Sequence, residues 1–436
     1  MLDLVFPDTA EVAAGGHLTL GGCDVVELAR EHGTPLIVYD RATIEARASS
    51  YSAILGADHV YYASKAFCCI AICELLEGLG IGVDVCSGGE LLTALTAGFP
   101  ADRIIFHGNN KSVDELVSAS EAGVGRIAVD SMDELERLSK VPGHSRLLLR
   151  VTPGVEAHTH EFVQTGQEDS KFGFPLGDGV ALDAIARAQE LDGYELIGLH
   201  AHIGSQIFEL AAFELAARRL AALAARARDD FGFETRELNL GGGLGIAHTD
   251  DEMTPDPQEA TARLQEIATD SFEEAGLQAP EVCVEPGRSL IGAAAITVYE
   301  VGTVKEIPGV RTYVSVDGGM SDNIRPALYG ARYEAKLANR MDARPGPLVA
   351  VAGKHCESGD VLIKEAHLPA DVSPGDLLCI PATGAYTYSM ASNYNRVPRP
   401  AVVLVEGGRA TEIVARETAS DLLRFDRHLD GAPVEA

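Results

Sequence analysis

Short apolar runs alternate with longer amphipathic stretches between about residue 59 and residue 290 of this 436-residue chain. The short runs have the length expected of buried strands, and the stretches between them have helical periodicity. We expect eight strands in this region, at His59–Ala63, Ile81–Val85, Arg103–Phe106, Arg126–Val129, Arg146–Val151, Leu196–His200, Glu237–Leu240 and Glu281–Val284.

Helical patterns separate these strands. Glu90 to Ala97 places its leucines on one face and is stopped by Gly98 and Pro100, while Ser131 to Glu134 opens another helix with a capping-box pattern. Eight strands, each followed by a helix, over roughly 230 residues are typical of a (β/α)8 TIM barrel. An open doubly wound sheet is the rival, but it usually has fewer strands and a glycine-rich turn after the first. Here the glycine-rich turn follows the seventh.

After about residue 295 this alternation ends and the chain looks all-β. Strand patterns lie at Thr312–Val316, Leu348–Val351, Val361–Lys364, Leu377–Ile380, Ala401–Val405 and Ala410–Val414, the last two flanking a predicted hairpin turn. The first 40 residues add strand patterns at His17–Leu20 and Leu36–Tyr39, around a helix from Asp24 to His32. We therefore expect an N-terminal segment (1–40) that joins the β domain, a barrel (41–295) and a C-terminal β domain (296–436).

Composition and charge exclude several functions. The formal net charge is −30, with 35 basic and 65 acidic side chains, which argues against binding to nucleic acid or to anionic membranes. The longest uncharged apolar run, around Ser289 to Tyr299, is too short to cross a bilayer, and the N-terminus lacks the pattern of a signal peptide. The eight cysteines form no CxxC pair, so we expect mostly buried free thiols, with Cys356 as the exception, in a cytoplasmic protein without a metal site.

Reactive side chains collect at the ends of the predicted strands, where barrel enzymes place their chemistry. Lys65 follows the first strand, and its amine can form a Schiff base with an aldehyde cofactor if its surroundings lower its pKa from about 10.4. The ends of later strands add Asp84, Ser87, Glu90, Arg150, His200, His202, Gly204, Ser205, Gly241–Gly243 and Glu285–Arg288.

Several of these features have a structural as well as a functional interpretation. Gly241–Gly243 can be an ordinary turn, or its bare N–H groups can bind a phosphate. Glu285 can pair with a surface arginine or, if buried, face a pyridinium nitrogen, and a lone histidine such as His202 is more often structural than catalytic. Taken together, an amine, a phosphate cradle and a buried glutamate are the parts that pyridoxal phosphate requires.

Seven motifs resemble those of the barrel-type pyridoxal phosphate-dependent decarboxylases and keep the family order over nearly the whole chain. They are Tyr62–Lys65, Asp84–Glu90, His202–Gln206, Gly241–Gly245, Glu285–Arg288, Cys356–Asp360 and Gly384–Tyr386. Within that family the likeness is strongest to the members that act on meso-2,6-diaminopimelate. Asn239-Leu240, before the glycine triplet, departs from the frequent Asp-Ile pair but replaces no group that does chemistry.

The resemblance implies an alanine-racemase-like barrel that binds pyridoxal 5′-phosphate, and a C-terminal β domain. It also implies a head-to-tail homodimer with active sites at the interface, each completed by the partner's β domain. The implied reaction is decarboxylation of an amino-acid substrate, meso-2,6-diaminopimelate, to L-lysine and carbon dioxide, as the last step of lysine biosynthesis.

The resemblance further implies residue roles. Lys65 would hold the cofactor, Glu285 would keep its ring nitrogen protonated, and His202 would stack on its face. The remaining cofactor contacts would come from Asp84, Arg150, Ser205, Gly241, Gly242, Gly243, Gly287, Arg288 and Tyr386.

For the substrate, Arg288, Arg325 and Tyr329 resemble the residues that bind the carboxylate that is not lost, a task that suits arginine. From the opposite subunit, Cys356 resembles the acid that reprotonates the α-carbon, and Glu357 resembles the partner of a substrate ammonium. Ser358 and Tyr386 complete the expected substrate-binding set.

Two alternatives remain open. The first is a relative that decarboxylates ornithine, lysine, arginine or carboxynorspermidine; such enzymes usually place an aspartate after the cysteine, whereas Glu357 stands here and Arg325 suits a second carboxylate. The second is a non-catalytic carrier of the cofactor, which the loss of Lys65 or Cys356 would have favoured, yet both are present. Alanine racemase shares the fold but uses a tyrosine base opposite the lysine.

Overall fold

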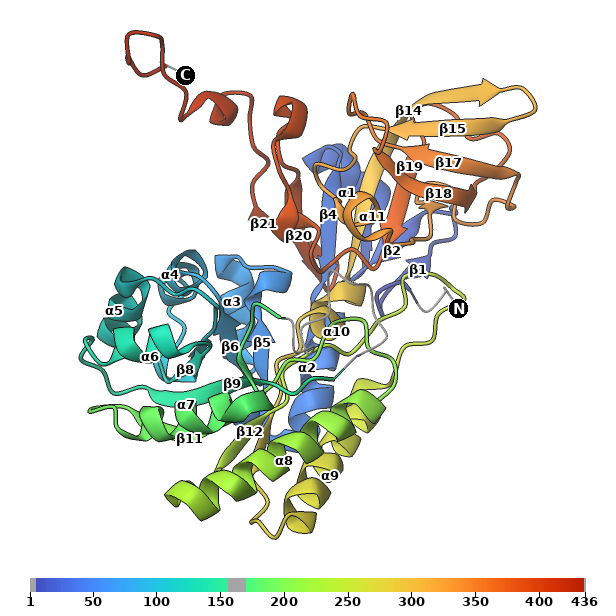
Figure 1. Cartoon of the computed structure of the whole chain (residues 1–436). Coiled ribbons are helices and arrows are strands. Elements are labelled where there is room, and N and C mark those ends of the chain that lie inside the picture. The colour runs from blue at the N-terminus through green and yellow to red at the C-terminus, as the bar shows by residue number, and fades with distance from the viewer. Residues whose placement is uncertain (1–4, 156–169, 435–436) are drawn as a thin grey trace. The chain divides into compact units, whose positions relative to one another are not determined.

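The computed structural model describes residues 5–155 and 170–434, which form two compact units (Figure 1). Unit 1 contains the chain up to Glu45, the segment Ala247–Met253 and the chain from Ile291 onward. Unit 2 contains Ala46–Ile246 and Thr254–Leu290. Residues 247–253 therefore belong to unit 1, although barrel elements precede and follow them in the sequence.

Unit 2 is built around parallel strands. They are β5 (Tyr61–Ala63), β6 (Gly82–Val85), β7 (Ile104–Phe106), β8 (Arg126–Val129), β9 (Arg146–Thr152), β11 (Glu195–His200), β12 (Glu237–Asn239) and β13 (Glu281–Cys283). Each strand pairs in parallel with the next one named, and a parallel bridge between Val60 and Val284 joins the last strand to the first. The sheet therefore closes into a barrel (Figure 1), and the predicted (β/α)8 fold is confirmed.

Helices follow the strands. They are α3 (Ile70–Gly78), α4 (Gly88–Thr96), α5 (Val113–Ala122), α6 (Met132–Leu138), α7 (Val180–Gln189), α8 (Ala211–Phe231), α9 (Pro257–Glu274) and α10 (Arg288–Ile291), while α2 (Arg41–Leu55) precedes β5. The capping box predicted at Ser131 is only half formed. The Ser131 hydroxyl accepts from the N–H of Glu134, but the Glu134 carboxylate bonds Asp130 N–H and the Lys111 ammonium instead. The reciprocal box lies one helix earlier, between Ser112 and Glu115.

Side chains from six of the eight barrel strands pack together in the barrel interior. Tyr61, Ile105, Ala128, Leu148, Ile197 and Cys283 form one buried cluster. Arg126 and Glu237, at the first residues of β8 and β12, form a buried two-pronged ion pair with N···O distances of 2.8–3.0 Å. These residues close the amino-terminal end of the barrel, so the carboxyl-terminal ends of the strands remain for chemistry.

Unit 1 is dominated by a mixed sheet. Its strands are β4 (Leu36–Asp40), β14 (Ala295–Ile307), β15 (Arg311–Val316), β16 (Lys336–Leu337), β17 (Leu348–Ala352), β18 (Val361–His367), β19 (Leu377–Pro381), β20 (Ala401–Glu406) and β21 (Arg409–Val414). The N-terminal strand β4 lies inside this sheet, antiparallel to β14 and parallel to β20. The prediction that the N-terminal segment completes the β domain is therefore confirmed.

Some strands of unit 1 differ from the sequence-based prediction. The longest strand, β14, was noticed only as an apolar run, because its first five residues are all buried and show no alternation. A small sheet of β1 (Glu11–Val12), β2 (Leu18–Leu20) and β3 (Cys23–Asp24) precedes α1 (Val25–His32), whose N-cap residue is Asp24. Cys86 is exposed, so Cys356 is not the sole exception among the thiols.

Within the described residues, we find no helix whose length and apolar character would allow it to cross a membrane.

Candidate active site

Lys65 is presented by a short helical turn, Ser64–Ala66, directly after β5. Its side chain is exposed, while Tyr62 on the preceding strand is buried. The Tyr62 hydroxyl donates to the carbonyl of Phe67 at 2.9 Å and accepts from the Phe67 N–H at 3.1 Å. Tyr62 thus ties the turn on both sides of Lys65 and holds the amine at the carboxyl-terminal end of the barrel.

Glu285 follows β13 and is only 5% exposed. Its Oε1 accepts from His107 Nε2 at 2.7 Å and from Asn239 Nδ2 at 2.9 Å, and its Oε2 accepts from His200 Nε2 at 3.0 Å. Burial raises the pKa of this carboxyl group, but the two imidazoles outweigh burial and hold the pKa well below its ordinary value. The alternative of a surface ion pair is therefore excluded, and Glu285 is an ionised carboxylate inside the barrel.

Asp84, Arg150 and His202 lie around this carboxylate. Asp84 Oδ1 is 4.0 Å from His107 Nε2, and burial raises the pKa of Asp84 to about 6 although His107 opposes the rise. Burial also lowers the pKa of Arg150, whose guanidinium lies 4.3 Å from the centre of the Phe172 ring. Burial and the charge of Lys65 hold the pKa of His202 well below its ordinary value, so its imidazole is neutral.

The glycine triplet packs too closely for side chains. A Cβ atom on Gly242 would lie 2.1 Å from the carbonyl oxygen of Glu285, and one on Gly243 would lie 2.4 Å from that of Gly204. Gly241 and Gly243 also have φ angles of 66° and 120°, which disfavour other residues. The triplet is therefore more than an ordinary turn, because its backbone packs directly against the segments that follow β11 and β13.

Two of the three backbone amides of the glycine triplet already donate hydrogen bonds within the protein. Gly241 N–H donates to Asn239 Oδ1 at 2.9 Å, and Gly242 N–H donates to His202 Nδ1 at 3.3 Å. In the described parts of the chain, no group accepts a hydrogen bond from the N–H of Gly243 or Gly287. Nearby, the Arg288 guanidinium donates to Ser205 Oγ at 3.1 Å, so a cation and a hydroxyl lie together.

These groups fit a pyridoxal phosphate cofactor. The lysine amine suits the aldehyde, the amides without acceptors and the arginine–serine pair suit the phosphate, and the buried carboxylate suits the ring nitrogen. Asp84 Oδ2, buried and without a hydrogen-bond partner among the described residues, is a further acceptor at the same end of the barrel.

Arg325 begins α11 (Arg325–Tyr329) in unit 1 and is only 4% exposed. Its Nη1 donates to His248 Nε2 at 3.0 Å and to the Tyr333 hydroxyl. Among the described residues, no carboxylate forms an ion pair with Arg325, and the Nε of Arg325 has no hydrogen-bond partner. A buried cation without a counter-anion is costly, so this guanidinium is suited to an anionic ligand.

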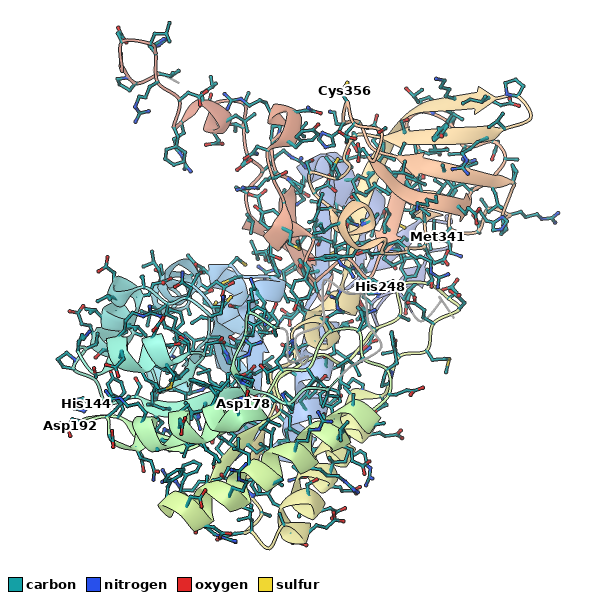
Figure 2. The ribbon with its side chains drawn as sticks, viewed as in Figure 1. His144, Asp178, Asp192, His248, Met341 and Cys356 are labelled. Carbon is teal, nitrogen blue, oxygen red and sulfur yellow. The ribbon has the colours of Figure 1, made fainter. Side chains whose placement is uncertain are left out.

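Cys356, which is labelled in Figure 2, lies exposed on the loop between β17 and β18. Its neighbours Glu357 and Ser358 are exposed as well. The Cys356 N–H donates to Asn395 Oδ1 at 3.1 Å. The Glu357 carboxylate accepts from Ser358 Oγ and from the N–H of Gly359 on the same loop. Tyr329 ends α11, and Tyr386 is half-buried with a φ of 59°.

Several residues that lie at the candidate site were not identified from the sequence. His107 and Asp130 directly follow the third and fourth barrel strands, so reading every strand end would have found both. Asn239 was noted only as a departure from a motif. His248 and Tyr333 have no local signal, because they meet Arg325 only through the folding of unit 1.

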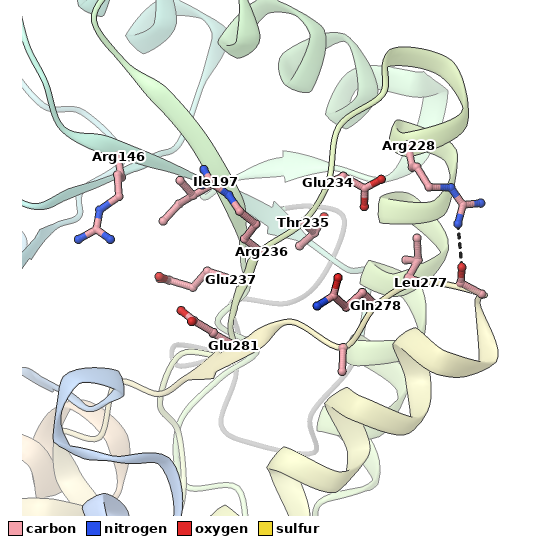
Figure 3. Close-up of a pocket in the computed structure, with 12 residues that line it drawn as sticks. Arg146, Ile197, Arg228, Glu234, Thr235, Arg236, Glu237, Leu277, Gln278 and Glu281 are labelled. Carbon is pink, nitrogen blue, oxygen red and sulfur yellow. Dashed lines mark hydrogen bonds between the residues drawn. The ribbon is translucent and has the colours of Figure 1, made fainter.

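Unit 2 contains a cavity of about 780 Å³, and Figure 3 shows residues that line it. Arg146, Glu237 and Glu281 line it, and these are the first residues of β9, β12 and β13. The cavity therefore lies at the amino-terminal end of the barrel, away from Lys65 and Glu285. Because barrel enzymes act at the other end, we do not assign the chemistry to it.

Comparison with known proteins agrees with this geometry. Residues 41–292 match the family model described as pyridoxal-dependent decarboxylase, pyridoxal binding domain. Together with the closed barrel and its lysine, glycines and buried glutamate, this match defines a pyridoxal-dependent decarboxylase by class, with pyridoxal phosphate as the cofactor.

Individual relatives narrow the class. Diaminopimelate decarboxylase of Bacillus subtilis is 52% identical over 419 residues, covering 94% of this chain and 95% of that protein. The crystal structure of diaminopimelate decarboxylase from M. jannaschii in complex with L-lysine has a TM-score of 0.89 at 33% identity, covering 97% of this chain and 98% of that chain. The Vibrio vulnificus lysine/ornithine decarboxylase, at 23% identity and a TM-score of 0.75, shares the fold. The chain belongs to the diaminopimelate decarboxylase family.

Proposed function

We propose that this protein decarboxylates meso-2,6-diaminopimelate to L-lysine and carbon dioxide, as the last step of lysine biosynthesis in the cytoplasm. The eight curated relatives named diaminopimelate decarboxylase that we compared, at 45–52% identity over nearly their whole length, support it. The single observation that carries the choice of substrate is Arg325. Its buried guanidinium has only neutral partners among the described residues, which suits a substrate with a second carboxylate.

The residues of unit 2 would hold the cofactor. Bound pyridoxal phosphate supplies the electron sink for the electron pair released when carbon dioxide leaves. Lys65 would hold the cofactor through its aldehyde group, ionised Glu285 would keep a proton on the ring nitrogen, and neutral His202 would pack on the ring without adding charge. Asp84 and Arg150 would orient the amine and the ring hydroxyl. Ser205, Arg288 and the amides of Gly243 and Gly287 would hold the phosphate, with Tyr386 assisting. Gly241 and Gly242 would support this loop by close packing.

The residues of unit 1 would bind and protonate the substrate. Arg325 and Tyr329, with Arg288, hold the carboxylate that is retained, which leaves the other carboxylate free to depart. Cys356 donates a proton to the α-carbon after carbon dioxide leaves. Glu357, Ser358 and Tyr386 complete the substrate contacts. We propose that Cys356 and Glu357 act on the active site of the second subunit in a homodimer.

A decarboxylase of ornithine or lysine is the competing candidate, since such an enzyme shares the fold. Those substrates have one carboxylate, so Arg325 would keep no anionic partner after that group departs. Carbon dioxide release should be measured with purified protein on meso-diaminopimelate, L-lysine and L-ornithine. We expect kcat/KM for diaminopimelate to exceed the others by a factor on the order of 10² or more. Comparable release from L-lysine would contradict the proposal.

A further inference from the structure

The carboxylate of Glu285 has three hydrogen-bond donors from three strand ends. His107 Nε2 and Asn239 Nδ2 donate to Oε1 at 2.7 and 2.9 Å, and His200 Nε2 donates to Oε2 at 3.0 Å. A carboxylate accepts about four hydrogen bonds in all. One position on Oε2 therefore remains for a donor from outside this set.

Both histidines face the Glu285 carboxylate through Nε2, and each donates its hydrogen bond from that atom. His200 is 1% exposed, and its Nδ1 has no partner among the described residues, so a second proton there would be a buried donor without an acceptor. The rings of His107 and His200 lie 4.7 Å apart, so two positive charges would repel each other. Asn239 is fixed as a donor as well, because its Oδ1 accepts from Gly241 N–H and turns its NH2 group toward Glu285.

We propose that His107 and His200 are positioning residues that hold Glu285 as an ionised carboxylate and leave one acceptor position on Oε2 for a cationic N–H donor. The inference rests on the proposed function, in which that donor is the protonated ring nitrogen of pyridoxal phosphate. Three donated hydrogen bonds make the carboxylate a weaker base, so the shared proton stays on the ring nitrogen. With one donor removed, the carboxylate becomes more basic and competes for that proton.

Other charged groups near the Glu285 carboxylate also influence whether the shared proton stays on the ring nitrogen or moves to the carboxylate. Asp84 lies beside His107 and adds negative charge once it ionises, whereas Arg150 and Lys65 add positive charge. His202 is neutral. Substitutions of His107 leave these groups in place, so a matched series at position 107 reports on the hydrogen bond itself.

The test compares the affinity of the cofactor-free protein for two ligands. One is pyridoxal phosphate, and the other is 1-deazapyridoxal 5′-phosphate, in which a CH group replaces the ring nitrogen. The wild type should bind pyridoxal phosphate more tightly. In His107→Phe, which has no donor, this preference should shrink by a factor on the order of 10. His107→Gln, whose amide can donate, should restore most of it.

The exposed residue His144 (Figure 2) provides the control, and His144→Gln should leave both affinities unchanged. His200→Phe and His200→Gln repeat the comparison if His107→Phe does not fold. Equal weakening of both ligands in the folded Phe variants would show a purely structural role and overturn the inference, as would an unchanged preference. A Zn²⁺ titration tests the remaining alternative, that His107, His200 and Glu285 form a metal site. The inference would be overturned if the protein bound Zn²⁺, if His107→Phe abolished that binding, and if pyridoxal phosphate did not displace the ion.

The outcome separates this inference from the proposed substrate. A wild type that binds both ligands equally would overturn the contact of Glu285 with the ring nitrogen, and the inference with it. A retained ring-nitrogen preference that falls in His107→Phe supports the inference even if diaminopimelate is not decarboxylated, in which case only the proposed substrate fails.

Discussion

At the scale of single residues, the buried charges fall into two groups. In unit 2, two buried ion pairs neutralise their own charges: Arg126 pairs with Glu237, and Lys111 pairs with Glu134. Breaking such a pair typically costs about 3–5 kcal/mol, because the remaining charge stays buried. Arg325 differs, since its hydrogen-bond partners among the described residues, His248 and Tyr333, are neutral. The first group serves the fold, whereas Arg325 is suited to a ligand.

Arg325→Ala should therefore impair the reaction far more than cofactor binding. Losing one desolvated, charge-assisted contact should lower kcat/KM for diaminopimelate by a factor on the order of 10² or more. Steady-state kinetics on cofactor-saturated enzyme measure this, and Arg311→Ala, at an exposed position on β15, is the control. If Arg325→Ala loses the cofactor instead, the residue belongs to the phosphate site and the argument for a second carboxylate fails.

Asp84 should make stability depend on pH. Burial raises its pKa from 3.8 to about 6 in the folded protein. Between these values the folded chain holds more protons than the unfolded chain. The Asp84 contribution to the free energy of unfolding therefore falls as pH rises from about 4 to about 6 and then stays constant.

Asp84→Asn removes this titration, so the variant should gain stability relative to the wild type as pH rises through that range. The gain should level off above pH 6 at roughly 3 kcal/mol. Urea unfolding of the cofactor-free proteins at a series of pH values measures it, and the exposed Asp58→Asn serves as control. Parallel pH profiles for wild type and Asp84→Asn would contradict the assignment.

At the scale of elements, β4 is the strand on which unit 1 depends most. All five of its residues are buried, and it bonds β14 on one side and β20 on the other. Its neighbours come from residues about 260 to 370 positions further along the chain. Since a central strand satisfies the backbone of both neighbours, its loss would expose two hydrogen-bonding edges.

Val38→Asp should therefore prevent unit 1 from folding, because Val38 is fully buried and an aspartate there would be an unpaired buried charge. Val12→Asp, on the exposed strand β1, makes the same chemical change and should be tolerated. Soluble yield and thermal unfolding of the two variants measure the difference. Equal behaviour of the two would show that β4 is not required.

A buried carboxylate, that of Asp360, anchors the loop that carries Cys356. Asp360 accepts from the N–H of His355 at 2.9 Å and from that of Met320 at 2.7 Å. Gly353 and Gly319 allow this approach, since a Cβ on either would lie within 2.6 Å of the carboxylate. The thiol is therefore exposed but rigidly attached, as a proton donor to another group requires.

At the scale of the whole molecule, the reactive groups are divided between two units. Lys65 belongs to unit 2 and Cys356 to unit 1. In the proposed homodimer, each active site takes Lys65 from one chain and Cys356 from the other. Lys65→Ala and Cys356→Ala should each be inactive alone and should recover activity when unfolded together and reassembled.

The expected recovery follows from counting sites. Random reassembly gives mixed dimers in about half of the molecules, and each mixed dimer has one site with both defects and one with neither, so about a quarter of wild-type activity should return. Reassembled wild type is the control for refolding yield. Full activity of Cys356→Ala by itself would show an inert thiol, and no recovery in the mixture would place the donor in the same chain.

Much of this architecture could be predicted from the sequence. Alternating strands and helices have periodicities set by local backbone geometry, so the eight barrel strands were placed to within about two residues. Motifs after those strands also pointed to Lys65, Asp84, Arg150, Glu285 and the glycine triplet, because parallel strands bring their carboxyl ends to one edge.

Only the tertiary structure decided which side chains meet. His107, His200 and Asn239 surround Glu285 although they come from three strands spread over more than 100 residues, and His248 reaches Arg325 through a segment that leaves the barrel sequence to join unit 1. Such contacts depend on strand order and closure, not on local periodicity. The sequence by itself therefore determined the elements and the types of reactive group, while folding determined the partners that set their charge and orientation.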